Sequence, residues 1–263
     1  MGGLGRLYRI EGKVMDFAGQ HLVITGASTG IGKATAARVV RGGARVTLIA
    51  RRGELLADLC AELGAGAGWA AADVGRQDQL IAALDSAVAQ HGPIDALFLN
   101  AGTGGTFAPL EHYSDDAFDA LMAVNMQAPF WAVRHVLPAM KARGQGSILI
   151  TGSLASERGM AMNVAYVMSK HAVLGLARAA ALEGAAHGVR VNCLVPGFID
   201  TPLLDGVPAE QLTSLAANVP QGRLGSPEDV AEVAAFLLSS AAAHVTGQSW
   251  AVDGGVLGTL AVR

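Results

Sequence analysis

The chain has 263 residues, of which 51% are hydrophobic and 16% are charged, and its formal net charge is −3. Such a composition supplies a large apolar core and excludes an intrinsically disordered chain. The acidic balance and the absence of a long basic run argue against nucleic acid as the main ligand.

Short apolar runs alternate along the chain with segments of helical periodicity. We predict strands at 21–25, 45–50, 68–74, 94–102, 147–153, 189–197 and 249–255. Helices are predicted at 33–42, 54–63, 79–92, 165–185 and 226–240, and residues 115–144 are expected to form one long helix or a bent pair. Continuous apolar strands are typical of a parallel sheet that helices cover on both faces. The sequence therefore predicts a single α/β domain with a Rossmann-type doubly wound parallel sheet in three α/β/α layers.

Several kinds of site and location are disfavoured. Residues 1–14 are rich in Gly and lack the apolar core of a signal peptide, so we expect a flexible arm there, with Met15 as a candidate start and 15–263 as the domain. No stretch of about 20 apolar residues suggests a membrane span, and a cytoplasmic protein is expected. The two cysteines and seven histidines are scattered, which indicates neither a disulfide framework nor a metal site.

The first predicted strand runs directly into "TGASTGIG", a glycine-rich turn that precedes a helix. Backbone N–H groups and the helix dipole at such a junction favour phosphate, and glycine lets the backbone approach a ligand closely. The spacing is G-x-x-x-G-x-G, and many glycine-rich turns are merely tight connections. Its place after the first strand favours a dinucleotide cofactor. The residues expected to bind this cofactor are Gly26, Ser28, Thr29, Gly30, Ile31 and Gly32.

The end of the second predicted strand, "LIARR", indicates which dinucleotide is bound. An acidic residue at this position would bind the ribose 2′-OH of NAD, whereas an arginine accommodates the 2′-phosphate of NADP. Arg51 and Arg52 occupy it, so NADP(H) is preferred and NAD(H) is the less favoured cofactor. The alternative is that both arginines are simply solvated at the start of a loop. Asp73, which ends the third predicted strand, either contacts adenine or caps a turn.

A Tyr and a Lys are paired in "VAYVMSK". Tyr166 and Lys170 are four residues apart, which puts both side chains on one face of a helix, a turn apart. The pair alone does not distinguish a chemical role from an amphipathic Tyr beside a solvated Lys.

Taken together, these segments resemble the short-chain dehydrogenase/reductase family in its compact single-domain form. The resemblance covers residues 19–256, and Ser153 and Tyr166 have the family's spacing of 13 residues. It rests on "TGASTGIG", "DV" at 73–74, "NAG" at 100–102, Asn125, Ser153, "YVMSK" and "PGFIDT" at 196–201. It implies an NADP(H)-dependent oxidoreductase that transfers hydride between nicotinamide and a carbonyl or secondary alcohol, with reduction as the favoured direction.

The resemblance assigns catalytic roles to four residues. Tyr166 would be the acid/base, and Lys170 would favour its phenolate form and bind the nicotinamide ribose. Ser153 would hydrogen-bond the substrate oxygen as charge develops on it. Asn125 would open its helix locally and hold a water that relays protons to Lys170. The alternatives are a Ser that only ends a strand and an Asn that faces solvent, and Ser156 has the wrong spacing for the role of Ser153.

Further cofactor contacts come from the same resemblance. "NAG" would support the sheet and the cofactor's ribose, and "PGFIDT" would cover the nicotinamide. The additional residues expected near the cofactor are Val74, Asn100, Ala101, Gly102, Tyr166, Lys170, Pro196, Gly197, Ile199 and Thr201.

The substrate is less clearly indicated than the chemistry. Residues 198–225 are expected to form a lid, and its apolar side chains favour a small, partly apolar carbonyl or alcohol. These side chains are Leu203, Leu204, Val207, Leu212 and Leu215, which alternatively only pack the lid onto the body. Met160 and Met162 suggest adaptable apolar walls. A 3-oxoacyl thioester reductase and a non-catalytic NADP-sensing protein are the alternative functions.

A homotetramer with two kinds of interface is also implied by the resemblance. One interface would pair helices 115–142 and 165–185 with their symmetry mates, and the other would use helix 226–240 and the strand near 249–253. The sequence "HAVLGLARAAALEGA" is apolar or small on most of its circumference, so this helix should be buried on more than one side. Loops of the same subunit are the alternative cover for it.

Overall fold

The computed structural model describes residues 15–259 and has a seven-stranded parallel sheet at its centre. The predicted arm at 1–14 lies outside the described residues. The strands follow the order β3-β2-β1-β4-β5-β6-β7. Strands β2 and β3 extend the sheet on one side of β1, and β4 to β7 extend it on the other, so the topological switch point lies between β1 and β4. The strands are β1 (His21–Thr25), β2 (Arg45–Ala50), β3 (Ala67–Ala71), β4 (Ala96–Leu99), β5 (Gly146–Thr151), β6 (Val189–Pro196) and β7 (Ser249–Val252). Ligands of such sheets bind beyond the carboxyl ends of the strands, at this switch point.

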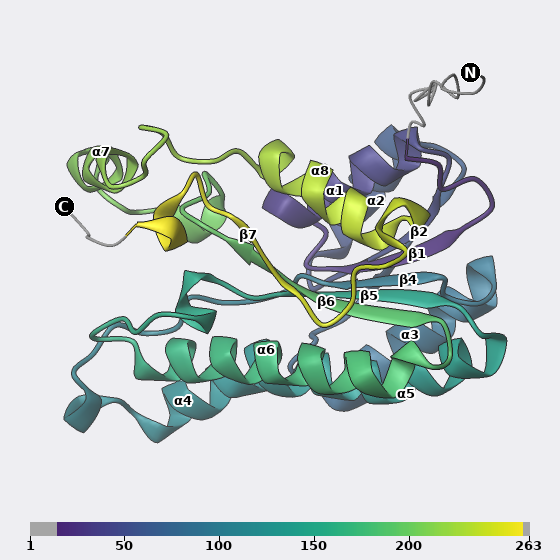
Figure 1. Cartoon of the computed structure of the whole chain (residues 1–263), viewed down its shortest axis with the longest axis horizontal. Helices are drawn as coiled ribbons and strands as arrows, with labels where there is room; N and C mark the ends of the chain where they lie inside the picture. Colours follow the sequence, from purple (N-terminus) through teal and green to yellow (C-terminus); the bar gives the residue numbers. More distant parts are fainter. Residues whose placement is uncertain (1–14, 260–263) are drawn as a thin grey trace, which may run out of the picture.

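Helices cover both faces of the sheet, as Figure 1 shows. On one face lie α1 (Gly30–Arg41), α2 (Gly53–Leu63) and α8 (Pro227–Leu238). On the other lie α3 (Gln77–His91), α5 (Ala128–Arg143) and α6 (Val164–Ala185), with α4 (Asp115–Met122) beside them. The short helix α7 (Ala209–Ala217) stands apart from both layers. This arrangement confirms the predicted doubly wound fold.

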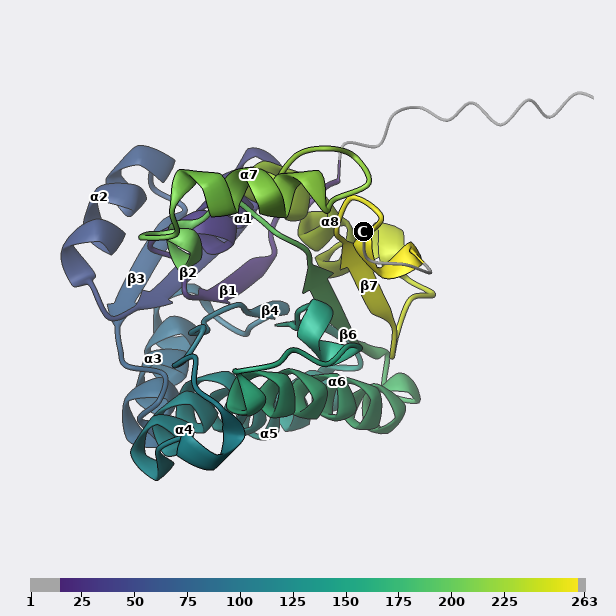
Figure 2. The same ribbon diagram turned by 90° about the vertical axis from the view of Figure 1, so that its left-hand side faces the viewer.

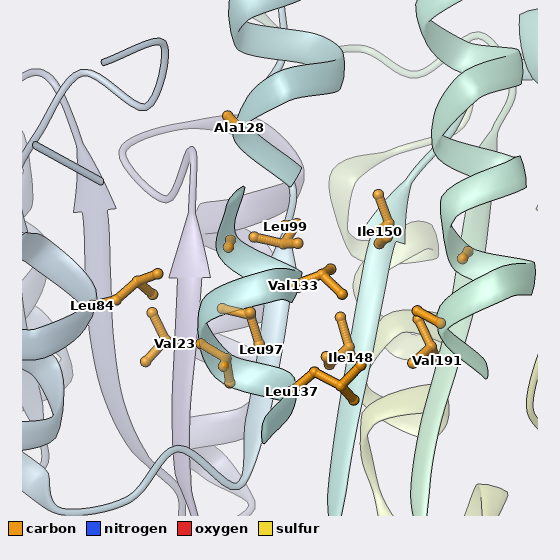
Figure 3. Packing of buried hydrophobic residues seen from close by; sticks show 14 of the residues in the cluster. Val23, Leu84, Leu97, Leu99, Ala128, Val133, Leu137, Ile148, Ile150 and Val191 are labelled. Atoms are coloured by element: carbon orange, nitrogen blue, oxygen red, sulfur yellow. The ribbon is translucent and has the colours of Figure 1, made fainter. Parts of the chain in front are cut away.

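The core explains why the strands are continuous apolar runs. Successive side chains of a strand point to opposite faces, and here both faces are buried. Val23, Leu97 and Ile148 pack against α3, α5 and α6, and Figure 3 shows this cluster. Their sequence neighbours Leu22 and Phe98 belong to the cluster beneath α1, α2 and α8. No helix within residues 15–259 has the length and apolar character needed to span a membrane, and the expected cytoplasmic location stays a prediction.

Element ends differ from the predictions in ways that shape the site. Strand β4 stops at Leu99 rather than 102, because the backbone N–H groups of Asn100 and Ala101 donate to Thr25 Oγ1 instead of continuing a ladder (3.1 Å each). Strand β5 stops at Thr151 rather than 153. Helix α1 begins at Gly30, inside the glycine-rich turn, rather than at 33. The earlier strand ends leave Asn100, Ala101, Gly102 and Ser153 outside the strands, whereas the earlier start of α1 places Gly30, Ile31 and Gly32 in its first turn.

The segment 115–144, predicted as one helix or a bent pair, is two α-helices joined by a π-helical turn at Ala123–Gln127. The N–H of Ala128 donates to the carbonyl of Ala123, five residues earlier, which is the wider hydrogen bonding of a π turn. Such turns occur often at functional sites, and Asn125 lies in the middle of this one.

Candidate active site

Tyr166 and Lys170 lie on successive turns of α6, with Lys170 Nζ 5.6 Å from the centre of the Tyr166 ring. Lys170 is only 4% exposed, so the alternative of a solvated lysine is wrong. Its Nζ donates to the carbonyl oxygen of Thr151 at the end of β5 (2.8 Å). A buried ammonium requires such a partner. The lysine therefore fixes α6 to the carboxyl end of the sheet and holds a positive charge beside the tyrosine.

Asn125 faces the interior rather than solvent, since it is 1% exposed. Its Oδ1 accepts from the N–H of Thr103 (2.8 Å), and its Nδ2 donates to the carbonyl of the same residue (2.9 Å). Nδ2 also donates to Ser169 Oγ (3.4 Å), next to Lys170 in sequence. A Cβ placed on Gly102 would lie 3.4 Å from Asn125 Oδ1 and 3.7 Å from Lys170 Nζ, so Gly102 lies close to both side chains. The relay water expected here stays a prediction.

The two candidate serines have different environments. Ser153 follows β5 and begins a short 3₁₀ turn, where its Oγ accepts from the N–H of Ala155 (3.2 Å). Ser153 remains partly exposed, whereas Ser156 is 1% exposed and its Oγ accepts from the N–H of Ser153 (3.1 Å). Ser156 therefore has a structural role in the turn. The Ser153 hydroxyl hydrogen is not donated to any residue in 15–259, and its expected contact with a substrate oxygen stays a prediction.

The glycine-rich turn has the shape of an anion site. Gly26 has φ 66°, and a Cβ there would lie 2.7 Å from Ala101 Cα, so a larger residue would push apart the ends of β1 and β4. Thr29 precedes α1 without a side-chain cap, and the first turn of α1 has no acidic residue. The N–H groups at this helix N-terminus are therefore left for a phosphate.

Asn100 connects the strands that carry the site. Its Nδ2 donates to the carbonyls of Thr25 and Gly26 (3.3 Å each), and its Oδ1 accepts from Thr151 Oγ1 (3.3 Å). The ends of β1, β4 and β5 are thus held together beneath the turn. This supports the expected structural role of "NAG"; contact with a ribose stays a prediction.

The two arginines after β2 lie beside the turn. Arg52 Nη2 donates to Ser28 Oγ (3.3 Å), so Arg52 reaches the glycine-rich turn, and both side chains are at the surface. Arg51 is exposed and makes no side-chain hydrogen bond within the described part of the chain. Asp73 Oδ1 accepts from the N–H of Gly75 (3.0 Å), which shows the turn cap that was one of its two expected roles. The residues present therefore fit a nicotinamide dinucleotide at this edge of the sheet.

The segment after β6 crosses the carboxyl ends of the strands. Ile199 forms a bridge with Gly225, so the two ends of the predicted lid (198–225) are joined. A Cβ on Gly30, whose φ is 54°, would lie 3.2 Å from Thr201 Cγ2, which places Thr201 against the glycine-rich turn. Helices α7 and α4 lie on opposite sides of the carboxyl ends of the strands (Figure 2). The helix α7 itself was not predicted.

Two further features complete the description of the site. Within residues 15–259, no group of three or more His, Cys, Asp or Glu side chains is arranged to hold a metal ion. Asn163 ends the stretch 157–163, which was expected to line the pocket, but no individual role was expected for it. It is 1% exposed and its Nδ2 donates to the carbonyl of Gly104 (2.7 Å). This contact was not predictable, because it depends on how two distant loops meet.

The chain resembles known proteins both in sequence and in fold. A family model described as Enoyl-(Acyl carrier protein) reductase matches residues 26–257. The chain is 39% identical to cis-4-hydroxycyclohexanecarboxylate dehydrogenase of Sinomonas cyclohexanicum, over 91% of this chain and 97% of that protein. It is 37% identical to cyclohexanol dehydrogenase of Acinetobacter sp. (strain SE19), over 92% and 97%. The crystal structure of levodione reductase superimposes with a TM-score of 0.87 at 31% identity, over 91% and 98% of the two chains.

Proposed function

Because the chain belongs to the short-chain dehydrogenase/reductase family, whose members act on CH–OH or C=O groups with a nicotinamide cofactor, we propose that it uses NADP(H) to interconvert a cyclic secondary alcohol and its ketone. Tyr166 is the acid/base of this proposed reaction. The observation that carries this proposal is the buried Lys170 beside Tyr166, at the end of the sheet where the glycine-rich turn lies.

The proposed chemistry assigns one task to each side chain. The bound nicotinamide would supply the hydride to the carbonyl carbon, or accept it from the alcohol carbon. Tyr166 gives the matching proton to the substrate oxygen during reduction and takes it back during oxidation. Lys170 stabilises the resulting phenolate, since its ammonium lies 5.6 Å from the ring centre. Ser153 donates its free hydroxyl hydrogen to the same oxygen, and Asn125 fixes the turn that faces them.

The preference for NADP(H) is supported by charge. Arg51 and Arg52 follow β2 at the surface, and Arg52 contacts the glycine-rich turn through Ser28. No acidic residue occupies the position that would bind the ribose 2′-OH of NAD. A 2′-phosphate beside these guanidinium groups would gain charge-assisted hydrogen bonds. NAD(H) is the alternative cofactor.

The cyclic, partly apolar substrate is supported by two observations. Exposed apolar side chains lie on the loops that leave the carboxyl ends of the strands, among them Phe107, Met162 and Leu203. The relatives named above carry the names of cyclohexane derivatives, and levodione reductase is named for its substrate. An acyl thioester reductase is the second candidate, because the matching family model is described by that kind of activity.

A substrate panel followed at the NADPH absorbance band tests this function. We expect cyclohexanone to be reduced faster than acetoacetyl-CoA and crotonyl-CoA, and NADPH to be consumed faster than NADH. Cyclohexanol with NADP should give the reverse reaction. Faster turnover of either thioester would replace the proposal by the second candidate. Tight NADPH binding without turnover of any carbonyl would instead favour a sensing protein.

We further propose a homotetramer, because two surfaces leave large apolar side chains uncovered. On α5 and α6, Phe130, Met168 and Leu182 are 43%, 48% and 81% exposed. On the second surface, Trp250 of the edge strand β7 is 36% exposed and contacts Phe236 of α8 edge-to-face. Light scattering at micromolar protein is expected to give about four times the chain mass of 26.8 kDa. A monomer would overturn assembly, and a dimer would leave only one of the two interfaces.

A further inference from the structure

The loop that follows β4, which we call the front loop (residues 103–108), is fastened at three points. Asn125 holds both backbone groups of Thr103. Asn163 Nδ2 donates to the carbonyl of Gly104 (2.7 Å), and the N–H of Ala108 donates to the carbonyl of Met162 (2.8 Å). Two of these anchors belong to the segment just before α6, the helix that carries Tyr166.

The side chain of Asn163 contributes little to its own helix, although its backbone carbonyl accepts from the N–H of Val167 (3.2 Å). It precedes α6, but its side chain makes no capping hydrogen bond there. Although it is 1% exposed, its Oδ1 has no partner among residues 15–259. A buried polar atom without a partner destabilises the fold. The single hydrogen bond of this amide therefore serves the front loop rather than α6.

The neighbouring backbone is constrained as well. Met162 has φ 66°, and it is the one non-glycine residue with a positive φ in the described structure. Such a conformation is uncommon for Met and persists only where the surroundings impose it. Here the flanking hydrogen bonds from Ala108 and through Asn163 hold the segment against the front loop.

The front loop carries apolar surface at the edge of the site. Phe107 lies between the anchored residues Gly104 and Ala108 and is 64% exposed. A Cβ on Gly104 would lie 3.6 Å from Cδ1 of Leu203, which comes from the lid segment and is 57% exposed. Met162 contributes a third exposed side chain. The front loop thus lies beside both the lid segment and the segment before α6, and each of the three carries an exposed apolar side chain.

We propose that Asn163 is a positioning residue for substrate selectivity, which holds the front loop so that Phe107 forms one wall of the binding site for the ring of a cyclic substrate. This inference rests on the proposed ketone reductase activity. A small open-chain ketone would not reach Phe107, so its binding should not depend on Asn163. Proton transfer by Tyr166 should not depend on it either.

Asn163→Ala in the full chain tests the proposal. The KM for cyclohexanone should rise about tenfold, the size of a lost apolar contact, whereas the KM for propanone and the Kd for NADPH stay unchanged. The kcat for cyclohexanone should change less than about threefold. Asn192→Ala is the control. Asn192 lies on β6 and is also 1% exposed, and its Nδ2 also donates to a backbone carbonyl, that of Val245 (2.8 Å). Unlike Asn163, it also accepts at Oδ1, from the N–H of Gln248 (3.1 Å). This control variant should change neither KM.

Phe107→Ala keeps the inference testable if Asn163→Ala folds poorly, because the exposed Phe107 side chain can be removed without opening the core. This variant should show the same rise in the KM for cyclohexanone, and the double variant should show no further rise, since both act on one wall. Additive effects, or equal rises for cyclohexanone and propanone, would overturn the proposal.

Limited chymotrypsin digestion reports on the front loop without any catalysis. Cleavage after Phe107 should be several-fold faster in Asn163→Ala than in Asn192→Ala, and equal rates would refute the positioning role. If the unmodified protein reduces no ketone, the proposed function fails, while the digestion still shows whether Asn163 fastens the loop.

Discussion

Tyr166→Phe is expected to lower kcat at least a hundredfold while NADP(H) binding stays nearly unchanged. Phenylalanine keeps the aromatic ring at this position of α6 and removes only the hydroxyl that exchanges the proton. A positioned acid/base contributes about 10²–10⁴-fold to a reaction of this kind. Lys170 keeps its hydrogen bond to Thr151 in the variant, so the buried ammonium does not lose its partner.

Single-turnover consumption of NADPH with cyclohexanone measures the chemical step in this variant, and a fluorescence titration measures cofactor binding. Tyr113→Phe is the control, because the Tyr113 hydroxyl is buried without a hydrogen-bond partner among the described residues. Its removal should leave kcat unchanged. A loss smaller than tenfold in Tyr166→Phe would mean that another residue carries the proton.

The parts of the fold that local pattern determines were predicted closely. Strands β1 and β2 have the predicted bounds, because each is a short, continuous apolar run with a clear break on both sides. Helix α7 was missed because it is short, has no fully buried residue and lies inside the segment that was interpreted as a lid. The ends of β4 and β5 were placed too late. For β4, the backbone N–H groups of Asn100 and Ala101 donate to Thr25 Oγ1, a long-range contact that no local pattern reports.

The candidate site was likewise predictable from the sequence only in part. The spacing of Tyr166 and Lys170 predicted a shared helix face, and Asn125 was expected to open its helix. The partners of these residues were not predictable from the sequence. Lys170 meets Thr151, and Asn163 meets Gly104, only because α6 packs along β5 and β6 with its first turns at the carboxyl end of the sheet. Such contacts join residues 19 and 59 positions apart, and no local periodicity reports them.

Arg51→Asp is expected to reverse the cofactor preference. The unmodified protein should bind NADPH more tightly than NADH, because a guanidinium group faces the 2′-phosphate in the proposed complex. The aspartate would repel that phosphate and could accept a hydrogen bond from the ribose 2′-OH of NAD. A hydrogen bond to a charged group contributes about 1.5–3 kcal/mol, and solvent screening at the exposed Arg51 favours the lower end. NADPH binding should therefore weaken about tenfold or more.

Titration of both cofactors against both proteins measures this change, and Arg41→Asp separates it from a change in net charge. Arg41 is exposed at the C-terminal end of α1, whereas the glycine-rich turn lies at the N-terminal end of the same helix. The Arg41 variant alters the total charge by the same amount but should keep the preference for NADPH, since salt screens charges separated by more than about 10 Å. Equal or tighter binding of NADH by the unmodified protein would contradict the assignment. A similar loss of NADPH binding in both variants would mean that long-range charge, rather than the position after β2, attracts the cofactor.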